Sequence, residues 1–331
     1  MMFYNLKAKG FMLTVVLFAT VSISGIYETA ICAEKYPTRE IELVINYAAG
    51  GQTDAMARIV GERVSKYLGV PIVPVNKPGA SGVLGASFVS NSTPDGYTVG
   101  TSGASNLGSV MATQNDVPYT SGDFAAIARA VKLDLIFVVK KGRFSSFQDV
   151  IKEEKQKPGS LTYASWGAKS ISHMAGELVN LEMGIKMQHV PFTGGAKALA
   201  AVLGGHVDVI ISTLSTCMPN IRAGNLACLA IASDSRVGDL PQIPTIKELG
   251  YPEVVIVGSD GFVTGSKVPK ERLAIIRAAF EKSIKDPDID EALKKAGMIP
   301  AYLSGENYQK WLASNLAVME KIAAKAGIMK D

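Results

Sequence analysis

Short apolar strands and amphipathic helices alternate along most of this chain, and no other feature of the sequence limits the fold as strongly. Residues 41–47 predict a buried strand, residues 48–52 a Gly-rich turn, and residues 54–68 a helix. Apolar side chains recur at helical spacing on one face of that helix, and Gly69 can end it in the left-handed conformation. Repetition of this unit predicts an α/β fold with largely parallel sheets and helices on both faces.

The repeated unit continues through the middle of the chain and changes near its end. Further strands are expected at 72–75, 97–102, 135–139, 161–165, 187–190, 207–212 and 226–232. Helices are expected at 82–90, near Glu177, Leu199 and Ile221, and after Gly258 from Pro269, at 288–296 and at 304–325. Beyond Gly258 the pattern thus predicts long helices only, and we expect this tail to pack across an existing lobe.

The length predicts two lobes, because roughly 300 residues exceed one small core. No linker marks a single boundary, so we expect crossings near Val131 and Val257. Lobe 1 would then comprise residues 34–131 with 258–331, and lobe 2 residues 132–257.

The first residues have the outline of a signal peptide. Lys7 and Lys9 precede an apolar run at 11–26 that is too short and too diluted by polar residues for a membrane span of roughly 20 residues. We expect residues 1–33 to be removed by cleavage after Ala33, which would place the mature protein in the periplasm or another extracytoplasmic space. The residues before Cys32 match a lipoprotein signal poorly, and a lipid anchor there stays open.

Cys217 and Cys228 are too few for a disulfide scaffold or a zinc site. We expect two small buried side chains, with a single disulfide between them left open. The net charge of +4 is spread along the chain without a basic block, so nucleic acid is not an expected partner.

The sequence gives little support for catalysis. It contains neither a Gly-x-Ser-x-Gly elbow nor a His-Glu-x-x-His helix, and we expect no catalytic residue, metal or cofactor. His173 either contacts a ligand or braces a loop. His189 is expected to be structural and His206 to be solvated. Asp208 either pairs with a ligand amine or orients a turn, and we expect the turn.

Small and hydroxyl-bearing residues gather in the loops that follow predicted strands, which is where open α/β sheets bind ligands. Glycines and free amides at helix starts suit an anion there, although an ordinary turn is an equal alternative for the first loop. The segment 76–82 lacks nucleotide-binding spacing and is expected to be a stiff turn. The predicted ligand-binding residues are Tyr47, Ala49, Gly50, Gly51, Gln52, Thr53, Asp54, Ser105, Asn106, Ser165, Trp166, Gly167, Ala168, Ser170, His173, Phe192, Thr193, Gly194 and Ser212.

Several short motifs occur in a recognisable order. They are Tyr36-Pro37, Ala49-Gly50-Gly51 with Asp54 and Arg58, Asn76-Lys77-Pro78-Gly79-Ala80, Pro94-Asp95-Gly96-Tyr97-Thr98, His173 with Ala175-Gly176-Glu177-Leu178, Val190-Pro191-Phe192 with Gly194, Gly204-Gly205 before Val207-Asp208, Arg222-Ala223-Gly224, Leu229-Ala230, and Pro244-Thr245 with Glu248 and Gly250. In this order the chain resembles the binding receptors of the tripartite tricarboxylate transporter family, called TctC or Bug proteins.

The resemblance implies a two-lobed periplasmic-binding-protein fold, type II-like, with a ligand cleft between the lobes. It implies a receptor that closes on a small carboxylate, such as a di- or tricarboxylate or an aromatic or other organic acid, held by backbone amides and ordered waters. It also implies a small and a large permease subunit as partners and no catalysis. We expect a monomer. A sensor that reports to a membrane kinase or chemoreceptor, or an exported enzyme acting on carboxylates, are the alternatives.

Three departures from the family pattern bear on the ligand. The loop 165–170 carries Trp166 and Lys169, the segment 258–262 replaces a Trp followed by Gly, and Phe192 replaces a Tyr. Together they predict a ligand that differs from citrate, with an apolar part that stacks on Trp166 or Phe192. Which carboxylate it is stays open.

Overall fold

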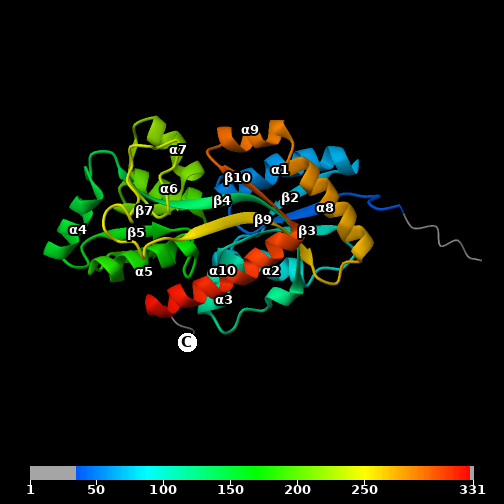
Figure 1. Cartoon of the computed structure of the whole chain (residues 1–331), viewed down its shortest axis with the longest axis horizontal. Coiled ribbons are helices and arrows are strands. Elements are labelled where there is room, and N and C mark those ends of the chain that lie inside the picture. Colours follow the sequence, from blue (N-terminus) through cyan, green and yellow to red (C-terminus); the bar gives the residue numbers. More distant parts are fainter. Residues whose placement is uncertain (1–34, 329–331) are drawn as a thin grey trace, which may run out of the picture. The chain divides into compact units, whose positions relative to one another are not determined.

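The computed structural model describes residues 35–328, and the chain from Pro37 onward forms one compact unit with a two-lobed α/β fold (Figure 1). Its strands are β1 (Ile41–Ile45), β2 (Ile72–Asn76), β3 (Thr98–Gly103), β4 (Phe124–Lys140), β5 (Thr162–Ser165), β6 (Gln188–Pro191), β7 (Val209–Thr213), β8 (Leu226–Ile231), β9 (Val257–Gly265) and β10 (Ile299–Ser304). Its helices are α1 (Gln52–Leu68), α2 (Val83–Ser90), α3 (Val110–Thr113), α4 (Phe147–Gln156), α5 (Ile171–Met183), α6 (Gly195–Gly204), α7 (Leu214–Arg222), α8 (Lys270–Ile284), α9 (Pro287–Lys295) and α10 (Gly305–Lys325).

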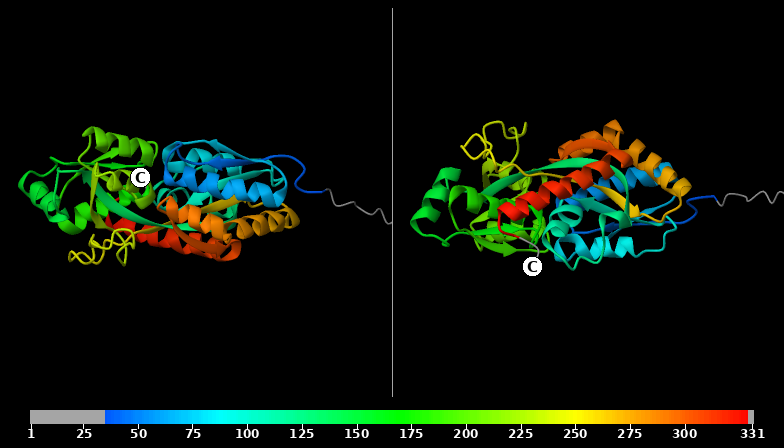
Figure 2. Two further views of the ribbon diagram at one scale, coloured as in Figure 1. Left: turned by 90° about the horizontal axis from the view of Figure 1, so that it is seen from above. Right: turned by 60° about the horizontal axis from the view of Figure 1, so that its bottom comes forward.

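Strand β4 links two sheets. Up to Asp134 it pairs with β9, and from Leu135 it pairs with β7. Sheet 1 therefore has the order β2-β1-β3-β9-β4-β10, and sheet 2 has the order β6-β5-β7-β4-β8. Figure 2 shows the two groups of elements from two further directions, with β4 running between them.

The strand pairing is more mixed than the sequence predicts. β1 is parallel to β2 and β3, and β5 is parallel to β6 and β7. Every pairing of β4 is antiparallel, as is that of β3 with β9. The parallel strands still end at the same edges as predicted, so the loops that follow them can meet.

Two hydrophobic clusters hold the helices on the sheets. In one, Val44 and Val263 of sheet 1 pack with α2, α3 and α10, and Tyr308 of α10 is fully buried. In the other, Ile136 and Ile210 of sheet 2 pack with α6 and α7. The described helices include none that is long and apolar enough to cross a membrane.

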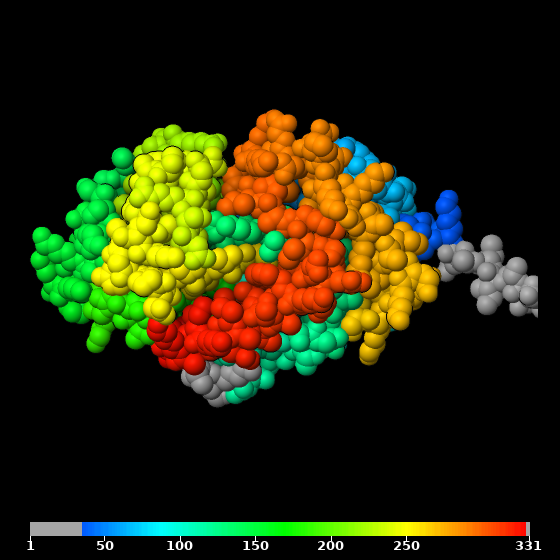
Figure 3. Space-filling view, viewed as in Figure 1, coloured from blue at the N-terminus to red at the C-terminus, as the bar shows by residue number. Residues whose placement is uncertain are grey.

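The C-terminal helix α10 contacts α3, which packs on sheet 1, and α5, which packs on sheet 2. Lys325 near its end forms ion pairs with Glu182 of α5, at 2.9 Å, and with Glu253, at 3.1 Å, in the segment between β8 and β9. Figure 3 shows this segment, in yellow, lying against the red end of α10. The prediction that the tail packs across an existing lobe is confirmed.

Five elements, or parts of elements, were not predicted. They are α3, α4, β9, β10 and the first half of β4. In β4 the charged Arg129, Lys132 and Asp134 interrupt the apolar pattern, and in β9 four small or polar residues at 258–261 hide the strand signal. The prediction of helices alone after Gly258 is therefore wrong.

Other details agree with the sequence. Cys217 and Cys228 are buried, as predicted, and both are free thiols, so the disulfide that the sequence left open is not formed in this structure. The signal segment, the cleavage site after Ala33 and Cys32 lie outside the described residues. The lobe boundaries at residues 131 and 257 stay a prediction.

Candidate functional site

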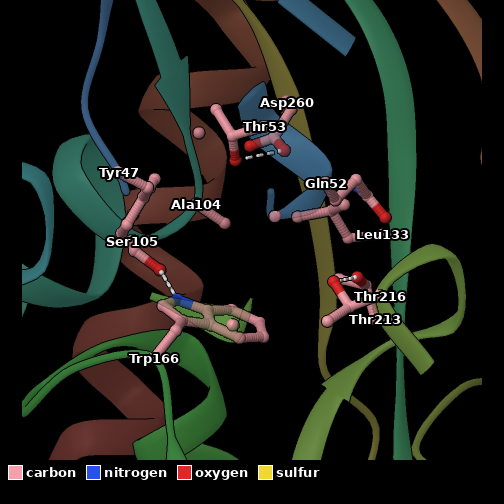
Figure 4. A pocket seen from close by; sticks show the side chains of 13 residues that line it. Tyr47, Gln52, Thr53, Ala104, Ser105, Leu133, Trp166, Thr213, Thr216 and Asp260 are labelled. Atoms are coloured by element: carbon pink, nitrogen blue, oxygen red, sulfur yellow. Dashed lines mark hydrogen bonds between the residues drawn. The ribbon is translucent and has the colours of Figure 1, made fainter. Parts of the chain in front are cut away.

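A cavity lies where loops from the two sheets meet, and it holds about 470 Å³ of empty space, part of it open to solvent (Figure 4). It is lined by Tyr47, Gly51, Gln52, Thr53, Gly103, Ala104, Ser105, Leu133, Trp166, Gly195, Thr213, Thr216 and Asp260. Most of these residues follow the carboxyl ends of the parallel strands β1, β3, β5, β6 and β7. The polar groups of several loops therefore converge on one space between the two sheets, as is typical of a small-molecule site.

The turn between β1 and α1 is fixed from behind by Asp54. Its carboxylate accepts hydrogen bonds from the backbone N–H of Gly50 at 3.1 Å, from Arg58 at 2.9 Å and from Asn76 at 3.0 Å. Although burial opposes it, these hydrogen bonds hold the pKa of Asp54 below its usual value. Gly50 adopts a φ of 88°, which an L side chain disfavours. Asp54 thus shapes the loop and does not line the cavity.

Three helices begin at the cavity without a side-chain cap. None of the cap residues of α1, α6 and α7, which are Gly51, Gly194 and Thr213, makes a side-chain hydrogen bond to the first turn of its helix. By contrast, α5 behind the cavity is capped by the Ser170 hydroxyl, which accepts from the N–H of His173. The N–H groups at an uncapped helix start carry partial positive charge and lack intrahelical partners. The cavity is therefore supplied with anion-binding donors.

Neutral polar side chains complete the wall. The Tyr47 hydroxyl donates to the Ser81 carbonyl at 3.0 Å, and burial raises the pKa of Tyr47, so the ring stays uncharged. The Trp166 Nε1–H donates to the Ser105 hydroxyl at 3.3 Å, which joins a loop of sheet 2 to a loop of sheet 1. Gln52 Oε1 accepts from the Ser215 hydroxyl, whereas the buried Gln52 Nε2 has no partner in the described part of the chain.

One acid faces the cavity. Asp260 is 5% exposed, and its Oδ2 accepts from the Thr53 hydroxyl at 2.9 Å. Burial raises the pKa of Asp260 to about 6, against the opposing effects of Thr53 and Gln52. The lining residues include no Lys, Arg or His.

Further contacts close the two sets of loops on each other. The Ser81 hydroxyl donates to the Ala168 carbonyl, and the Ser109 hydroxyl donates to the Lys169 carbonyl at 2.8 Å. The Lys169 ammonium donates to the Thr113 carbonyl at 3.1 Å. The segment 76–82, expected only as a stiff turn, therefore reaches across to the 165–170 loop.

The structure places six of the predicted site residues on the cavity wall: Tyr47, Gly51, Gln52, Thr53, Ser105 and Trp166. The glycines and alanines of the same loops, at 49, 50, 167, 168 and 194, lie beside the wall and do not line it. Asn106 accepts from the Gly103 N–H at 2.9 Å and so fixes the β3 loop. Ser212 is buried near Gly195. Phe192 packs on the core of sheet 2, Thr193 is exposed, and neither lines the cavity, so stacking of a ligand on Phe192 stays a prediction.

The histidines behind the 165–170 loop act as supports. His173 Nδ1 accepts from the Lys169 N–H at 2.9 Å, which supports its role as a brace of the loop, whereas contact with a ligand stays a prediction. Its ring stacks on that of His189, with centroids 3.8 Å apart. His189 Nε2 lies 2.7 Å from the Ser165 hydroxyl, but Ser165 is fully buried and lies off the cavity wall. Neither residue of this pair lines the cavity.

Two other predictions on single residues are confirmed. His206 is exposed, and Asp208 accepts from both the N–H and the hydroxyl of Thr162, which orients the start of β5. The described residues contain no group of three or more His, Cys, Asp or Glu that could hold a metal ion.

Sequence reasoning missed seven lining residues: Gly103, Ala104, Leu133, Gly195, Thr213, Thr216 and Asp260. The signal for Asp260 was present, because an acid interrupts a segment of otherwise small and apolar residues. From the sequence alone, the segment 258–262 indicates only the loss of an aromatic surface.

The chain is similar to known binding proteins over most of its length. Residues 56–328 match the family described as "Tripartite tricarboxylate transporter family receptor". A Cupriavidus necator protein described as "UPF0065 protein in gbd 5'region" is 31% identical over 310 residues, 90% of each chain. A solved structure of an R. palustris protein with adipate has a TM-score of 0.86 and 26% identity, and covers 90% of this chain and 100% of its own. The periplasmic binding protein BugD has a TM-score of 0.84 and 25% identity, with 89% and 100% covered.

Proposed function

This chain belongs to the tripartite tricarboxylate transporter receptor family, and we propose that it is exported, captures a small carboxylate in the cavity, and delivers it to the membrane subunits of such a transporter. The solute-binding role is common to the family and its structural relatives. The R. palustris relative solved with adipate supports a carboxylate as the ligand class.

The uncapped starts of α1, α6 and α7 carry this proposal. Each contact between a carboxylate and a helix N-terminus contributes about 0.3–1 kcal/mol at an exposed site and up to about 2 kcal/mol in a partly buried one. Because three such helices begin at one cavity, a carboxylate there gains several donors without needing a cationic side chain. Burial inside the closed loops strengthens each of these contacts.

We further propose that residues 34–131 with 258–331 move against residues 132–257 when the ligand enters. The contacts from Ser81 to Ala168 and from Ser105 to Trp166 join the two sets. Opening would break them and expose the cavity. Identical small-angle scattering profiles with and without saturating ligand would count against this motion.

The test is a thermal-shift measurement on purified protein that has been unfolded and refolded to remove bound ligand. The panel would contain mono- and dicarboxylates, tricarboxylates, aromatic acids, amino acids, sugars and phosphate. A ligand at a hundred times its dissociation constant stabilises the native state by about 2.7 kcal/mol, which raises Tm by a few degrees. A response to acids supports the proposal, and a response to sugars or phosphate alone overturns it.

Delivery to a transporter is tested in cells. Deleting the gene should abolish uptake of the identified radiolabelled acid, and restoring the gene should recover it. Unchanged uptake in the deletion strain would contradict the transport role.

A further inference from the structure

We propose that the ligand carries an ammonium group as well as a carboxylate, and that Asp260 binds this ammonium. The inference rests on the proposed function, since it names the kind of carboxylate that the receptor takes. An amino acid or a related amino-carboxylate is the chemical class that fits.

Asp260 is built into the centre of sheet 1. It lies on β9, opposite Gly103 of β3 and Val131 of β4. A Cβ at position 103 would lie 2.7 Å from Asp260 Oδ1, so a glycine at this position leaves room for the carboxylate. The acid therefore sits on a rigid strand and reaches the cavity wall, where it can position a ligand group.

The charge of Asp260 has no protein counterpart. No ion pair joins it to any residue in the described range 35–328, and the side chains that stabilise its charge, Thr53 and Gln52, are both neutral. The titratable groups that face it are Tyr47 and Tyr308, and burial raises the pKa of both, so neither supplies a positive charge or becomes an anion. On the adjacent strand, Lys132 pairs with Asp134 at 3.4 Å. A buried carboxylate without a cation is unfavourable, and a ligand ammonium would remove that penalty.

The two ends of the cavity suit the two charges of a zwitterion. Figure 4 shows Asp260 and Thr53 at one end and Thr213 and Thr216 at the other. The second end is formed by the starts of α6 and α7, which favour an anion. Trp166 and Leu133 lie on the wall as apolar surface for the rest of the ligand.

A second ligand carboxylate would fit Asp260 poorly. Two carboxylates within a few ångströms repel each other, and one of them must take up a proton. Dicarboxylate binding would therefore strengthen as the pH falls below the Asp260 pKa of about 6, whereas ammonium binding would weaken. The sign of the pH dependence separates the two ligand classes.

The experiment uses pairs of acids that differ only in one amine. Suitable pairs are glutarate and glutamate, succinate and aspartate, 3-phenylpropionate and phenylalanine, and 4-methylpentanoate and leucine, with putrescine and phenethylamine as amines that lack a carboxylate. Titration calorimetry at pH 7 would be run on the wild-type protein and on Asp260→Asn. Asp134→Asn is the matched control, because Asp134 is an equally buried acid that lies off the cavity wall.

We expect the amine-bearing member of one or more pairs to bind and its partner to bind at least tenfold more weakly. Asp260→Asn should weaken the binding of the amine-bearing acid at least tenfold, and Asp134→Asn should leave it unchanged. In the wild-type protein, lowering the pH from 7 to 5 reduces the ionised fraction of a group with a pKa of about 6 by about tenfold, and the affinity should fall equally. This measurement tests the proposal even if Asp260→Asn does not fold.

The other outcomes are distinct. Equal binding of both members of a pair, or tighter binding at pH 5, overturns the ammonium inference and leaves the carboxylate receptor standing. Binding of the simple amines alone overturns both. Binding of no acid by the wild-type protein overturns the proposed function itself.

Discussion

Replacing Asp260 by Asn should make the ligand-free protein more stable at neutral pH. Burial raises the pKa of Asp260 from 3.8 to about 6, so the folded state favours the protonated acid. The unfolded chain ionises near pH 4 and the folded chain near pH 6, so each pH unit between them costs about 1.4 kcal/mol of stability. The penalty is absent below pH 4 and reaches about 3 kcal/mol above pH 6. The amide keeps the shape and removes the charge, so it should recover most of this loss.

The assay is urea denaturation of refolded, ligand-free wild-type protein and Asp260→Asn from pH 4 to pH 7.5. The difference in the free energy of unfolding should be small at pH 4, grow towards pH 6.5 and then stay constant. Other titrating groups are shared by both proteins and cancel in the difference. A difference that does not depend on pH, or a variant that is less stable at pH 7.5, would refute the reasoning.

Two further predictions concern the loops around the cavity. Gly167→Ala would place a methyl group 2.2 Å from the Ser81 hydroxyl oxygen, and overpacking of about 1–3 kcal/mol should weaken ligand binding roughly 5- to 150-fold. The control is Gly238→Ala, where the added methyl group meets nothing within 4 Å. If calorimetry gave Gly167→Ala the same ligand affinity as the wild type, the closed arrangement of the loops would be contradicted. Burial lowers the pKa of His189 to about 3, with a further contribution from His173. The neutral ring stabilises the fold above pH 6.5, and this stability is lost as the pH falls. Because the ring is partly exposed and therefore screened by solvent, the loss should be less than about 1.4 kcal/mol per pH unit. His189→Gln should flatten this loss in urea denaturation, and a slope equal to that of the wild type would disprove the assignment.

The sequence was most informative where one local pattern determines the element. The amphipathic pattern of α1 and the terminal Gly69, with φ of 72°, fixed that helix to within two residues. The parallel strands β1, β5 and β7 were found because each is an apolar run followed by a turn. Local pattern and tertiary structure agree in these segments.

The sequence was less informative where pairing partners determine the element. β4 exchanges β9 for β7 at Leu135, and no local signal marks that exchange. In β9, Gly258 and Gly261 leave room for neighbours, since a Cβ at either position would meet atoms under 3 Å away. Such residues have low strand propensity, and only their tertiary surroundings explain them.

Predicting the site had the same limits. The loops that line the cavity were identified because they follow parallel strands, a rule that depends on topology alone. Thr213, Thr216 and Asp260 were missed because no local pattern shows that they face the cavity. The start of α7 and strand β9 reach it only through the packing of the two sheets. The aromatic Phe192 was placed at the site by its neighbours in sequence, yet it packs on the core of sheet 2.

The proposed closure on the ligand can also be explained by the charges at the cavity. The hydrogen bonds from Ser81, Ser109 and Lys169 across the loops each contribute about 1 kcal/mol net and favour the closed form. Enclosing an ionised Asp260 without a cation opposes them. In the empty protein at neutral pH, these hydrogen bonds therefore act against one buried charge. A zwitterionic ligand supplies an anion to the helix starts and a cation to Asp260. It thereby neutralises the buried charge and keeps the hydrogen bonds across the loops, so binding shifts the equilibrium to the closed form.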